Sequence, residues 1–222
     1  RGDINLRKFN RAFLSVVGLF VGFKPMKIPG VEYAGVIEEL GSQVTLFSPG
    51  DAICGTTTGL SFGANAEYVC VPEKHKMGVL AQKPDSINFK EAACTPVGSM
   101  TAMWFLKKAQ LKKGDHILIY GASGSVGSFA VQLAKHFGAK VTAVCSSANV
   151  EMIKSLGADF VIDYKKENFA KNDQKYDIIF DAVGKITKSK SAPSLAGNGK
   201  FVTVKSLTKE KVEDLKFVLK LV

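Results

Sequence analysis

A glycine-rich loop is the part of this sequence whose residue types and spacing most clearly allow chemistry. Residues 121–127 read Gly-Ala-Ser-Gly-Ser-Val-Gly and lie between a compact apolar run and an amphipathic stretch. Such a loop between a strand and a helix lets a pyrophosphate approach bare backbone, while free N–H groups at the helix N-terminus bind its charge. The dinucleotide fingerprint G-x-G-x-x-G is met in part, because Ala122 stands at its first glycine and Gly124 and Gly127 occupy the other two.

The elements on either side of this loop favour a nucleotide site over an ordinary turn. A glycine-rich turn also occurs in other α/β proteins, and that alternative stays open. In the nucleotide reading, Gly124 allows close approach of a phosphate and Gly127 allows close contact between helix and strand. Because an apolar strand precedes the loop, and a helix and a second strand follow it, the sequence predicts a dinucleotide-binding βαβ unit.

The residues after the second strand of this unit bear on the choice of dinucleotide. An Asp or Glu about 20 residues beyond the loop would hold the ribose 2′-hydroxyl of NAD. This chain has Ser146 and Ser147 there, no carboxylate before Glu151, and further positive charge at Lys154 and at residues 165–166. Hydroxyls can donate to a 2′-phosphate that a carboxylate would repel, so the sequence favours NADPH over NADH. The alternative is that Ser146 only caps the following helix.

Two halves of the chain differ in the elements that must position these residues. Up to about residue 98, short apolar runs separated by Gly, Pro and Asp predict a mostly β domain. Its predicted strands are Val31–Leu40, Asp51–Gly55 and Ala66–Pro72. A helical pattern over Asn88–Lys108 follows, which we expect Ser86 to cap and Pro96 to divide.

The second half alternates between strands and helices. Buried-type apolar runs predict the strands, and amphipathic segments that end at glycine predict the helices. This alternation implies crossover connections and therefore a parallel sheet. The predicted strands are His116–Tyr120, Val141–Cys145, Phe160–Asp163, Tyr176–Ala182 and Lys200–Val204, and the predicted helices are Ser128–Phe137 and Val150–Leu156.

Composition limits the class of protein. The chain has 222 residues, of which 46% are hydrophobic and 23% charged, as is ordinary for a soluble globular protein with a sizeable core. The net charge of +10 suits a basic solvated surface or attraction for an anionic ligand, and no nucleic-acid motif accompanies it. The longest apolar run, Ala12–Phe23, is shorter than the roughly 20 residues that a membrane span needs.

The four cysteines bear on metal binding and on compartment. Cys54, Cys70, Cys94 and Cys145 form no C-x-x-C pair and no cluster with histidine at metal-ligand spacing. We therefore expect reduced thiols in a cytoplasmic protein without structural zinc. No signal peptide is visible, and because the chain starts at Arg1 without Met, we expect that a preceding segment is missing.

These motifs together resemble the quinone-oxidoreductase branch of the medium-chain dehydrogenases/reductases. In the second half, Gly121–Lys135 carries the resemblance together with the segments Lys154–Asp159 and Val161–Tyr164. In the first half, Ile28–Ile37 and Gly41–Val44 resemble that family's catalytic-domain signature, and the runs Pro49-Gly50-Asp51 and Ala66-Glu67-Tyr68 agree with it.

The resemblance implies an α/β fold with two domains. A GroES-like, mostly β catalytic domain would span residues 1–98, and a Rossmann domain with a doubly wound parallel sheet would span residues 99–222. The loop would hold the pyrophosphate, the two serines and Tyr164 would face the adenosine ribose, and the segment after the fourth strand would pass near the nicotinamide. The implied cofactor-binding residues are Thr101, Gly121, Ala122, Ser123, Gly124, Ser125, Val126, Gly127, Ser146, Ser147, Tyr164, Ala182, Val183 and Gly184.

The resemblance also bears on zinc. Zinc alcohol dehydrogenases of this superfamily use a Cys near the start of the catalytic domain and the His of a Gly-His-Glu motif. The corresponding triplet here is Gly30-Val31-Glu32, and residues 1–3 hold no Cys. Without a Lewis acid, alcohol oxidation is disfavoured, whereas hydride transfer to an electrophilic acceptor needs less acid assistance. No catalytic residue is assigned, although Asp3 and Asn5 match a stretch near the cleft and water could supply the proton.

The leading hypothesis is therefore an NADP(H)-dependent oxidoreductase that transfers hydride to a small electrophilic acceptor, a quinone or an α,β-unsaturated carbonyl. A non-catalytic NADPH-binding redox sensor or interaction protein and a zinc-dependent alcohol dehydrogenase remain as alternatives. The resemblance favours a homodimer, and the lack of a nucleic-acid motif argues against binding of nucleic acid. The resemblance also implies that the first strands of the catalytic domain are missing, together with the C-terminal segment that returns to that domain. Compared with the family, the chain has too few residues near positions 206–208, which implies a gap there.

Overall fold

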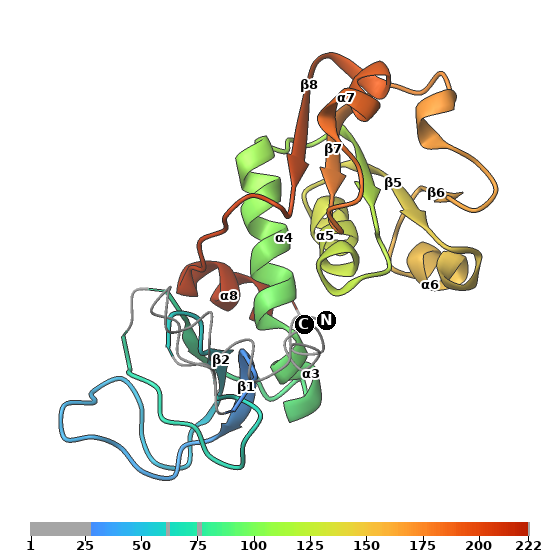
Figure 1. The fold of residues 1–222 in the computed structure, drawn as a ribbon. Coiled ribbons are helices and arrows are strands. Elements are labelled where there is room, and N and C mark those ends of the chain that lie inside the picture. Colours follow the sequence, from blue (N-terminus) through green and yellow to red (C-terminus); the bar gives the residue numbers. More distant parts are fainter. Residues whose placement is uncertain (1–27, 61–62, 75–76, 222) are drawn as a thin grey trace, which may run out of the picture. The chain divides into compact units, whose positions relative to one another are not determined.

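The computed structural model describes residues 28–60, 63–74 and 77–221. The apolar run Ala12–Phe23, the pair Asp3 and Asn5, and His75 lie outside the described residues. The chain divides into two compact units, residues 1–96 with 211–222 and residues 97–210 (Figure 1). Within the described residues, no helix combines the length and the apolar character needed to cross a membrane.

The first unit is built on a small antiparallel sheet. Strands β1 (Glu32–Val36), β2 (Ala52–Thr56) and β3 (Leu80–Gln82) pair in the order β1-β2-β3. The prediction of a strand over Ala66–Pro72 is wrong, because that segment is irregular and largely exposed and pairs with no strand. The third strand is β3 instead, whose three residues are too short to show an alternating pattern.

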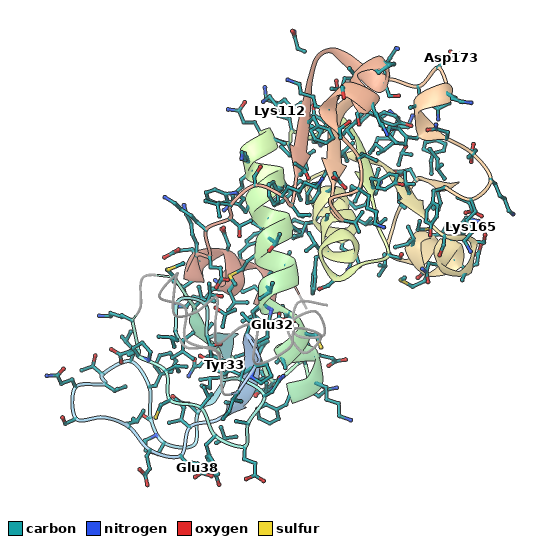
Figure 2. The ribbon with its side chains drawn as sticks, viewed as in Figure 1. Glu32, Tyr33, Glu38, Lys112, Lys165 and Asp173 are labelled. Carbon is teal, nitrogen blue, oxygen red and sulfur yellow. The ribbon has the colours of Figure 1, made fainter. Side chains whose placement is uncertain are left out.

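A tyrosine and a glycine face each other across β1 and β2. Tyr33, which is labelled in Figure 2, is paired directly with Gly55 in register. The Tyr33 side chain is buried. A Cβ at Gly55 would stand 2.7 Å from the Tyr33 hydroxyl and 2.2 Å from the Val79 carbonyl oxygen. The absence of a side chain at Gly55 therefore makes room for the Tyr33 ring over the sheet. Helix α8 (Val212–Leu219) packs against β3 in this unit.

Two helices follow β3, and proline separates them as predicted. Helix α3 (Phe89–Cys94) begins after Asn88, whose side chain accepts from the Glu91 N–H while the Glu91 carboxylate accepts from the Asn88 N–H. This capping box corrects the prediction that Ser86 caps the helix, since the box needs an acidic residue three positions after the cap. Helix α4 (Pro96–Ala109) starts at Pro96, which fits the first turn of a helix.

The second unit is a five-stranded parallel sheet with strand order β6-β5-β4-β7-β8, which confirms the predicted parallel arrangement. The strands lie within one or two residues of their predicted bounds, except that β8 begins five residues earlier and contains a register shift. Its elements are β4 (His116–Tyr120), α5 (Ser125–His136), β5 (Lys140–Cys145), α6 (Val150–Ser155), β6 (Phe160–Asp163), β7 (Tyr176–Asp181), α7 (Lys188–Ser191) and β8 (Leu195–Thr203), with short 3₁₀ turns at Ser147–Asn149, Phe169–Lys171 and Ala192–Ser194.

Both faces of this sheet are covered. On one face Leu118, Val144, Ile162 and Ile179 form a buried cluster that Phe169 closes. On the other face Phe105 of α4 packs on Phe180 of β7, with ring centroids 5.3 Å apart. Strands buried on both faces read as continuous apolar runs, which is why the sequence located them well. The carboxyl ends of the parallel strands are thereby fixed at one edge of the sheet.

Candidate functional site

The candidate site lies where the chain changes direction within the parallel sheet. From β4 the chain proceeds to β5 and β6 on one side and then crosses to β7 on the other. In open α/β sheets, ligands bind outside the carboxyl ends of the strands at such a switch point. The loops after β4 and β7 meet there, and the serines after β5 and the turn after β6 follow along the same edge.

Gly127 allows the helix after the loop to lie close to the strand before it. It is buried in the first turn of α5. A Cβ at this position would stand 2.3 Å from the Gly121 carbonyl oxygen and 2.7 Å from the Ala122 Cα, both of which are backbone atoms. No side chain fits there unless the backbone moves, as the sequence predicts for a residue at the contact of helix and strand.

Gly124 presents bare backbone that the packing of the described residues does not require. Its φ of −82° suits any residue, and a Cβ would meet only the Gly121 carbonyl oxygen at 3.5 Å. Gly124 is the N-cap of α5 and has no side chain with which to cap the helix. The first N–H groups of a helix have no acceptor within it, so those of Ser125, Val126 and Gly127 are directed at the open space beside Gly124. This arrangement suits an anion that must come close to the chain.

Gly121 and Ala122 form the inner, protein-facing side of the loop. Both N–H groups donate to the Val144 carbonyl oxygen at 3.0 Å, and Ala122 is fully buried. Gly121 has a φ of +81°, which glycine adopts without strain. A Cβ on it would stand 2.8 Å from the Val183 Cβ. The structure thus uses these two residues for the turn, while the half-buried Ser123 and the exposed Ser125 line its outer side.

Ser146 and Ser147 differ in what their hydroxyls can offer. The Ser147 hydroxyl donates to the Asp163 carboxylate at 2.5 Å, so its proton is already used in a hydrogen bond within the protein. The Ser146 hydroxyl accepts from the Asn149 side-chain amide at 3.2 Å and makes no cap hydrogen bond. The alternative that Ser146 caps the following helix through its side chain is therefore wrong. Among the described residues no acceptor takes the Ser146 hydroxyl proton, so it could donate to a ligand oxygen.

Asp163 at the end of β6 is a carboxylate that the sequence analysis did not place at this site. Ser147 and the Lys165 N–H donate to it, and the Ser147 hydrogen bond is the largest cause that holds its pKa below the usual value. The charges of Lys165 and Lys166 lower the same pKa further. The pairing was hidden in the sequence because it depends on the register of β5 and β6, which sets Cys145 opposite Asp163.

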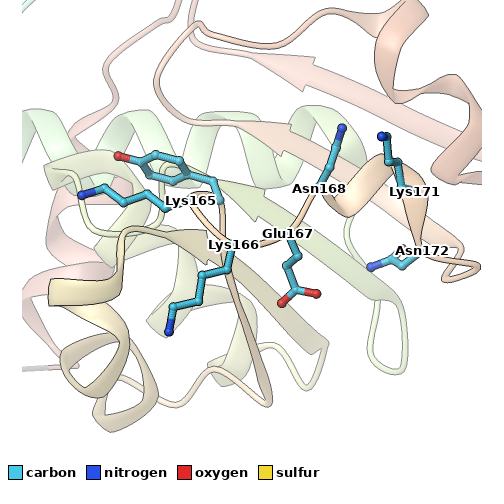
Figure 3. Close-up of a pocket in the computed structure, with 7 residues that line it drawn as sticks. Lys165, Lys166, Glu167, Asn168, Lys171 and Asn172 are labelled. Atoms are coloured by element: carbon cyan, nitrogen blue, oxygen red, sulfur yellow. The ribbon is translucent and has the colours of Figure 1, made fainter.

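A positively charged hollow borders this end of the site. It has a volume of about 520 Å³ and is formed by the turn after β6 (Figure 3). Lys165, Lys166 and Lys171 bring positive charge, which Glu167 partly offsets. Tyr164, which is 52% exposed, stands at its edge and offers a ring face and a hydroxyl to a ligand. The lining residues are Tyr164, Lys165, Lys166, Glu167, Asn168, Lys171 and Asn172.

The loop after β7 is organised by the carboxylate of Asp181. This side chain is fully buried and accepts from the Gly184 N–H at 2.9 Å and the Lys185 N–H at 3.1 Å. The N–H groups of Val183 and Ile186, each at 3.4 Å, and the Thr203 hydroxyl at 3.0 Å complete its partners. Ala182, Val183 and Gly184 are thereby fixed beside the glycine-rich loop. The signal for Asp181 was present in the sequence as an Asp three residues before a Gly at a strand end.

Thr101 lies on α4, one turn after the contact of that helix with α5. A Cβ at Gly98 would stand 2.4 Å from the Ser125 hydroxyl oxygen, so Gly98 faces the first turn of α5. Residues three apart on a helix share a face, so Thr101 is on the same side of α4 and is half-buried. The structure therefore places Thr101 on the α4 face turned towards α5. Its contact with a cofactor stays a prediction.

The described residues do not suit a catalytic zinc. Val31, between Gly30 and Glu32, has only an apolar side chain to offer. Burial raises the pKa of the Cys54 thiol to about 11, which disfavours the thiolate that a metal needs. Among residues 28–60, 63–74 and 77–221, no three His, Cys, Asp or Glu side chains come together as a metal site. We therefore derive no step through a metal.

Both units have counterparts among known protein families. Residues 3–85 match the family described as alcohol dehydrogenase GroES-like domain, and residues 125–221 match the family described as zinc-binding dehydrogenase. The chain is 43% identical over 170 residues to a 2-methylene-furan-3-one reductase of Solanum lycopersicum, and 40% identical over 170 residues to an NADPH-dependent alkenal/one oxidoreductase, chloroplastic, of Arabidopsis thaliana. Each of these matches covers 73% of this chain and 43% of the relative, so the chain spans less than half the length of either.

A solved structure also resembles this chain over most of its length. A quinone oxidoreductase from Coxiella burnetii superposes with a TM-score of 0.80 at 28% sequence identity, covering 93% of this chain and 70% of the other. This likeness and the two family matches confirm the predicted fold class, a GroES-like domain together with a Rossmann-like parallel sheet.

Proposed function

The chain belongs to the medium-chain dehydrogenase/reductase family, in its quinone oxidoreductase-like branch, and from that premise we propose that it is an NADPH-dependent reductase of quinones or α,β-unsaturated carbonyls. The observation that carries the proposal is the contrast between two glycines of one loop. Gly127 is required by the packing of the protein itself, whereas Gly124 faces open space at a helix N-terminus and is explained by a ligand.

Different residues of the site would bind different parts of the cofactor. The N–H groups of Ser125, Val126 and Gly127 would bind the pyrophosphate, since they lack acceptors within the helix. Ser146, with Tyr164 and the lysines of the hollow, would receive the adenosine ribose and its 2′-phosphate. The loop Ala182–Gly184 would lie beside the nicotinamide, because Asp181 and Gly121 hold it against the first loop.

NADPH, when bound, supplies the hydride, and the protein supplies position and electrostatics. At the centre of the Gly30-Val31-Glu32 triplet the described structure has no side chain that could bind a zinc ion as a Lewis acid, which favours an acceptor that is already electrophilic. Two relatives have names of this class, a 2-methylene-furan-3-one reductase and an alkenal/one oxidoreductase. We therefore take a quinone or an enone as the acceptor.

The test is NADPH oxidation, followed by the loss of absorbance of the reduced nicotinamide with a quinone, an enone or an alcohol/NADP⁺ pair as substrate. We expect turnover with the quinone or the enone and none with the alcohol. The Gly124→Val variant should lose turnover while its melting temperature stays close to that of the unaltered chain. Tight NADPH binding without turnover on any acceptor would favour a non-catalytic redox sensor, and zinc bound in stoichiometric amount would favour an alcohol dehydrogenase.

We also propose a homodimer in the cytoplasm. Strands β6 and β8 each have one neighbour in the sheet formed by the described residues, so either edge could pair with a second copy. All four cysteines are free, which suits a reducing compartment. Some relatives carry chloroplastic or mitochondrial in their names, so fractionation of cells that express the protein should decide the compartment. Light scattering of the purified protein should give the mass of a dimer.

A further inference from the structure

Lys205 follows β8, and hydrogen bonds to Asp181 of the neighbouring strand β7 fix its backbone. The Val204 N–H donates to the Asp181 carbonyl oxygen at 3.1 Å, and the Thr203 hydroxyl donates to the Asp181 carboxylate at 3.0 Å. The Ser206 N–H donates to the Thr203 carbonyl oxygen at 3.1 Å, which closes a turn around Lys205. Lys205 therefore has a defined position beside the loop that follows β7.

The Lys205 side chain lies across the backbone of Gly184. A Cβ built on Gly184 would stand 3.5 Å from the Lys205 Cγ and 3.3 Å from the Lys205 Cε, so the stem of the lysine follows the glycine. The ammonium is one bond beyond Cε and so lies next to this loop. The preceding residue, Val183, lies against Gly121 of the glycine-rich loop. Lys205 thus brings a positive charge to the loop that we propose to lie beside the nicotinamide.

This positive charge is not neutralised within the part of the chain that the structure describes. Lys205 is exposed, and no carboxylate of residues 28–60, 63–74 and 77–221 forms an ion pair with it. The Asp181 carboxylate is fully buried and already accepts from loop N–H groups and from the Thr203 hydroxyl. The Lys205 ammonium can therefore donate to a ligand.

The strand order β6-β5-β4-β7-β8 separates this ammonium from the positions proposed for the phosphates of the cofactor. The pyrophosphate would lie at the loop after β4 and the 2′-phosphate after β5 and β6, whereas Lys205 follows β8, two strands beyond β4. Neighbouring strands are about 4.8 Å apart, so the ends of β4 and β8 are separated by on the order of 10 Å. The reduced nicotinamide is uncharged, so negative charge at the β8 end would arise on the acceptor.

We propose that Lys205 is a catalytic residue whose ammonium donates a hydrogen bond to the carbonyl oxygen of the acceptor. This inference rests on the proposed function, since it assumes an enone beside the nicotinamide. When a hydride adds to the β-carbon of the enone, the C=C electron pair moves towards the carbonyl, and an enolate oxygen carries the negative charge. Lys205 keeps its proton and stabilises this charge, and a proton from solvent adds to the α-carbon to give the saturated ketone.

The first test compares Lys205→Met with Lys205→Arg in the reduction of an enone by NADPH. Lys205→Met keeps the stem but loses the charge, and it should lower kcat about a hundredfold, as for loss of one donor to an oxyanion. Lys205→Arg keeps a cationic donor and should retain most of the rate. Because Lys205 is exposed, both variants should melt like the unaltered chain. The matched control is Lys200→Met, on the same strand, whose ammonium donates to the Gln110 side chain at 2.5 Å.

The second test measures binding without turnover. In the presence of NADP⁺, 4-nitrophenolate serves as a stable mimic of the enolate oxygen, and nitrobenzene as its neutral counterpart. The unaltered chain should bind the phenolate about tenfold more tightly than nitrobenzene, as expected for one charge-assisted hydrogen bond. Lys205→Met should bind the two compounds equally, whereas Lys200→Met should keep the preference.

The outcomes separate this inference from the proposed function. If Lys205→Met keeps the rate of the unaltered chain or its preference for 4-nitrophenolate, the inference is overturned while the proposed function stands. A large loss of NADPH affinity in Lys205→Met also overturns it, because the ammonium would then bind the cofactor and not the acceptor. If the unaltered chain does not bind NADPH, or binds it and reduces no acceptor, the proposed function fails and the inference fails with it.

Discussion

The Val183 side chain lies directly over Gly121, so that a Cβ on the glycine would stand 2.8 Å from the Val183 Cβ. These residues belong to loops more than sixty positions apart in the chain, which follow the neighbouring strands β4 and β7. Their contact joins the loop that would bind phosphate to the loop that would bind nicotinamide. A change in either loop should therefore affect both ends of a bound dinucleotide.

Two alanine substitutions in the glycine-rich loop should have opposite profiles. Gly127→Ala places a Cβ against the Gly121 carbonyl and should destabilise the fold by about 1–3 kcal/mol, the range for overpacking. Gly124→Ala meets only one atom at 3.5 Å and should melt like the unaltered chain, yet weaken NADPH binding about tenfold by occupying the phosphate space. Thermal melts with and without NADPH measure both effects. A stable Gly127→Ala or a tightly binding Gly124→Ala would contradict this account.

The two serines after β5 should contribute unequally to the choice between NADPH and NADH. Ser146→Ala removes a hydroxyl whose proton is free and should lower NADPH affinity roughly tenfold, as for one charge-assisted hydrogen bond, with little change for NADH. Ser147→Ala removes a hydroxyl that is committed to Asp163 and should have the smaller effect on this ratio. Fluorescence titration with both dinucleotides gives the ratios directly. Equal losses in the two variants would show that we have misassigned the phosphate contact.

The cysteines should fall into two classes of reactivity. Cys54 and Cys145 are buried, and burial raises the pKa of both thiols, to about 11 for Cys54. Cys70 and Cys94 are exposed. A thiol reagent at pH 8 should therefore modify Cys70 and Cys94 in the native protein and all four only in denaturant, as peptide mass spectrometry can show. Labelling of Cys54 at the rate of Cys70 would contradict the buried position of β2.

His116 should make the fold sensitive to mild acid. Its ring contacts Tyr176 and lies 2.9 Å from the Thr142 hydroxyl, and burial, with help from Lys140, lowers its pKa from the usual 6.5. A histidine with a lowered pKa in the folded state stabilises the protein above the unfolded pKa, and this contribution is lost as the pH falls below about 6.5. His116→Gln should therefore lose less stability than the unaltered chain between pH 7.5 and 5.5 in urea unfolding. An unchanged loss in the variant would exclude His116 as the cause.

The parallel sheet was predictable because its strands carry a local signal. The run His116–Tyr120 is apolar and bounded by Asp115 and Gly121, and the structure gives β4 the same bounds. The first unit was harder, because β3 has three residues and the alternating segment Ala66–Pro72 found no partner strand. Alternation indicates that a strand is possible, whereas pairing decides whether it forms.

The site was predictable to the extent that its chemistry is local. The roles proposed for Gly124 and Gly127 follow from their spacing, and the structure gives the packing reason for Gly127. The pair Ser147 and Asp163 was not predictable, because its two members are 16 residues apart and meet only through the register of β5 and β6. The four N–H groups that Asp181 binds are local in sequence, yet their inward direction appears only in three dimensions.

The most direct test of the central claim is a fluorescence titration of the chain with NADPH and with NADH. We expect saturable binding of NADPH at least tenfold tighter than that of NADH, because Ser146 and the lysines near Tyr164 would receive the 2′-phosphate. Equal or tighter binding of NADH would contradict the assignment of the 2′-phosphate contact at the end of β5. Binding of neither dinucleotide would contradict the nucleotide site itself.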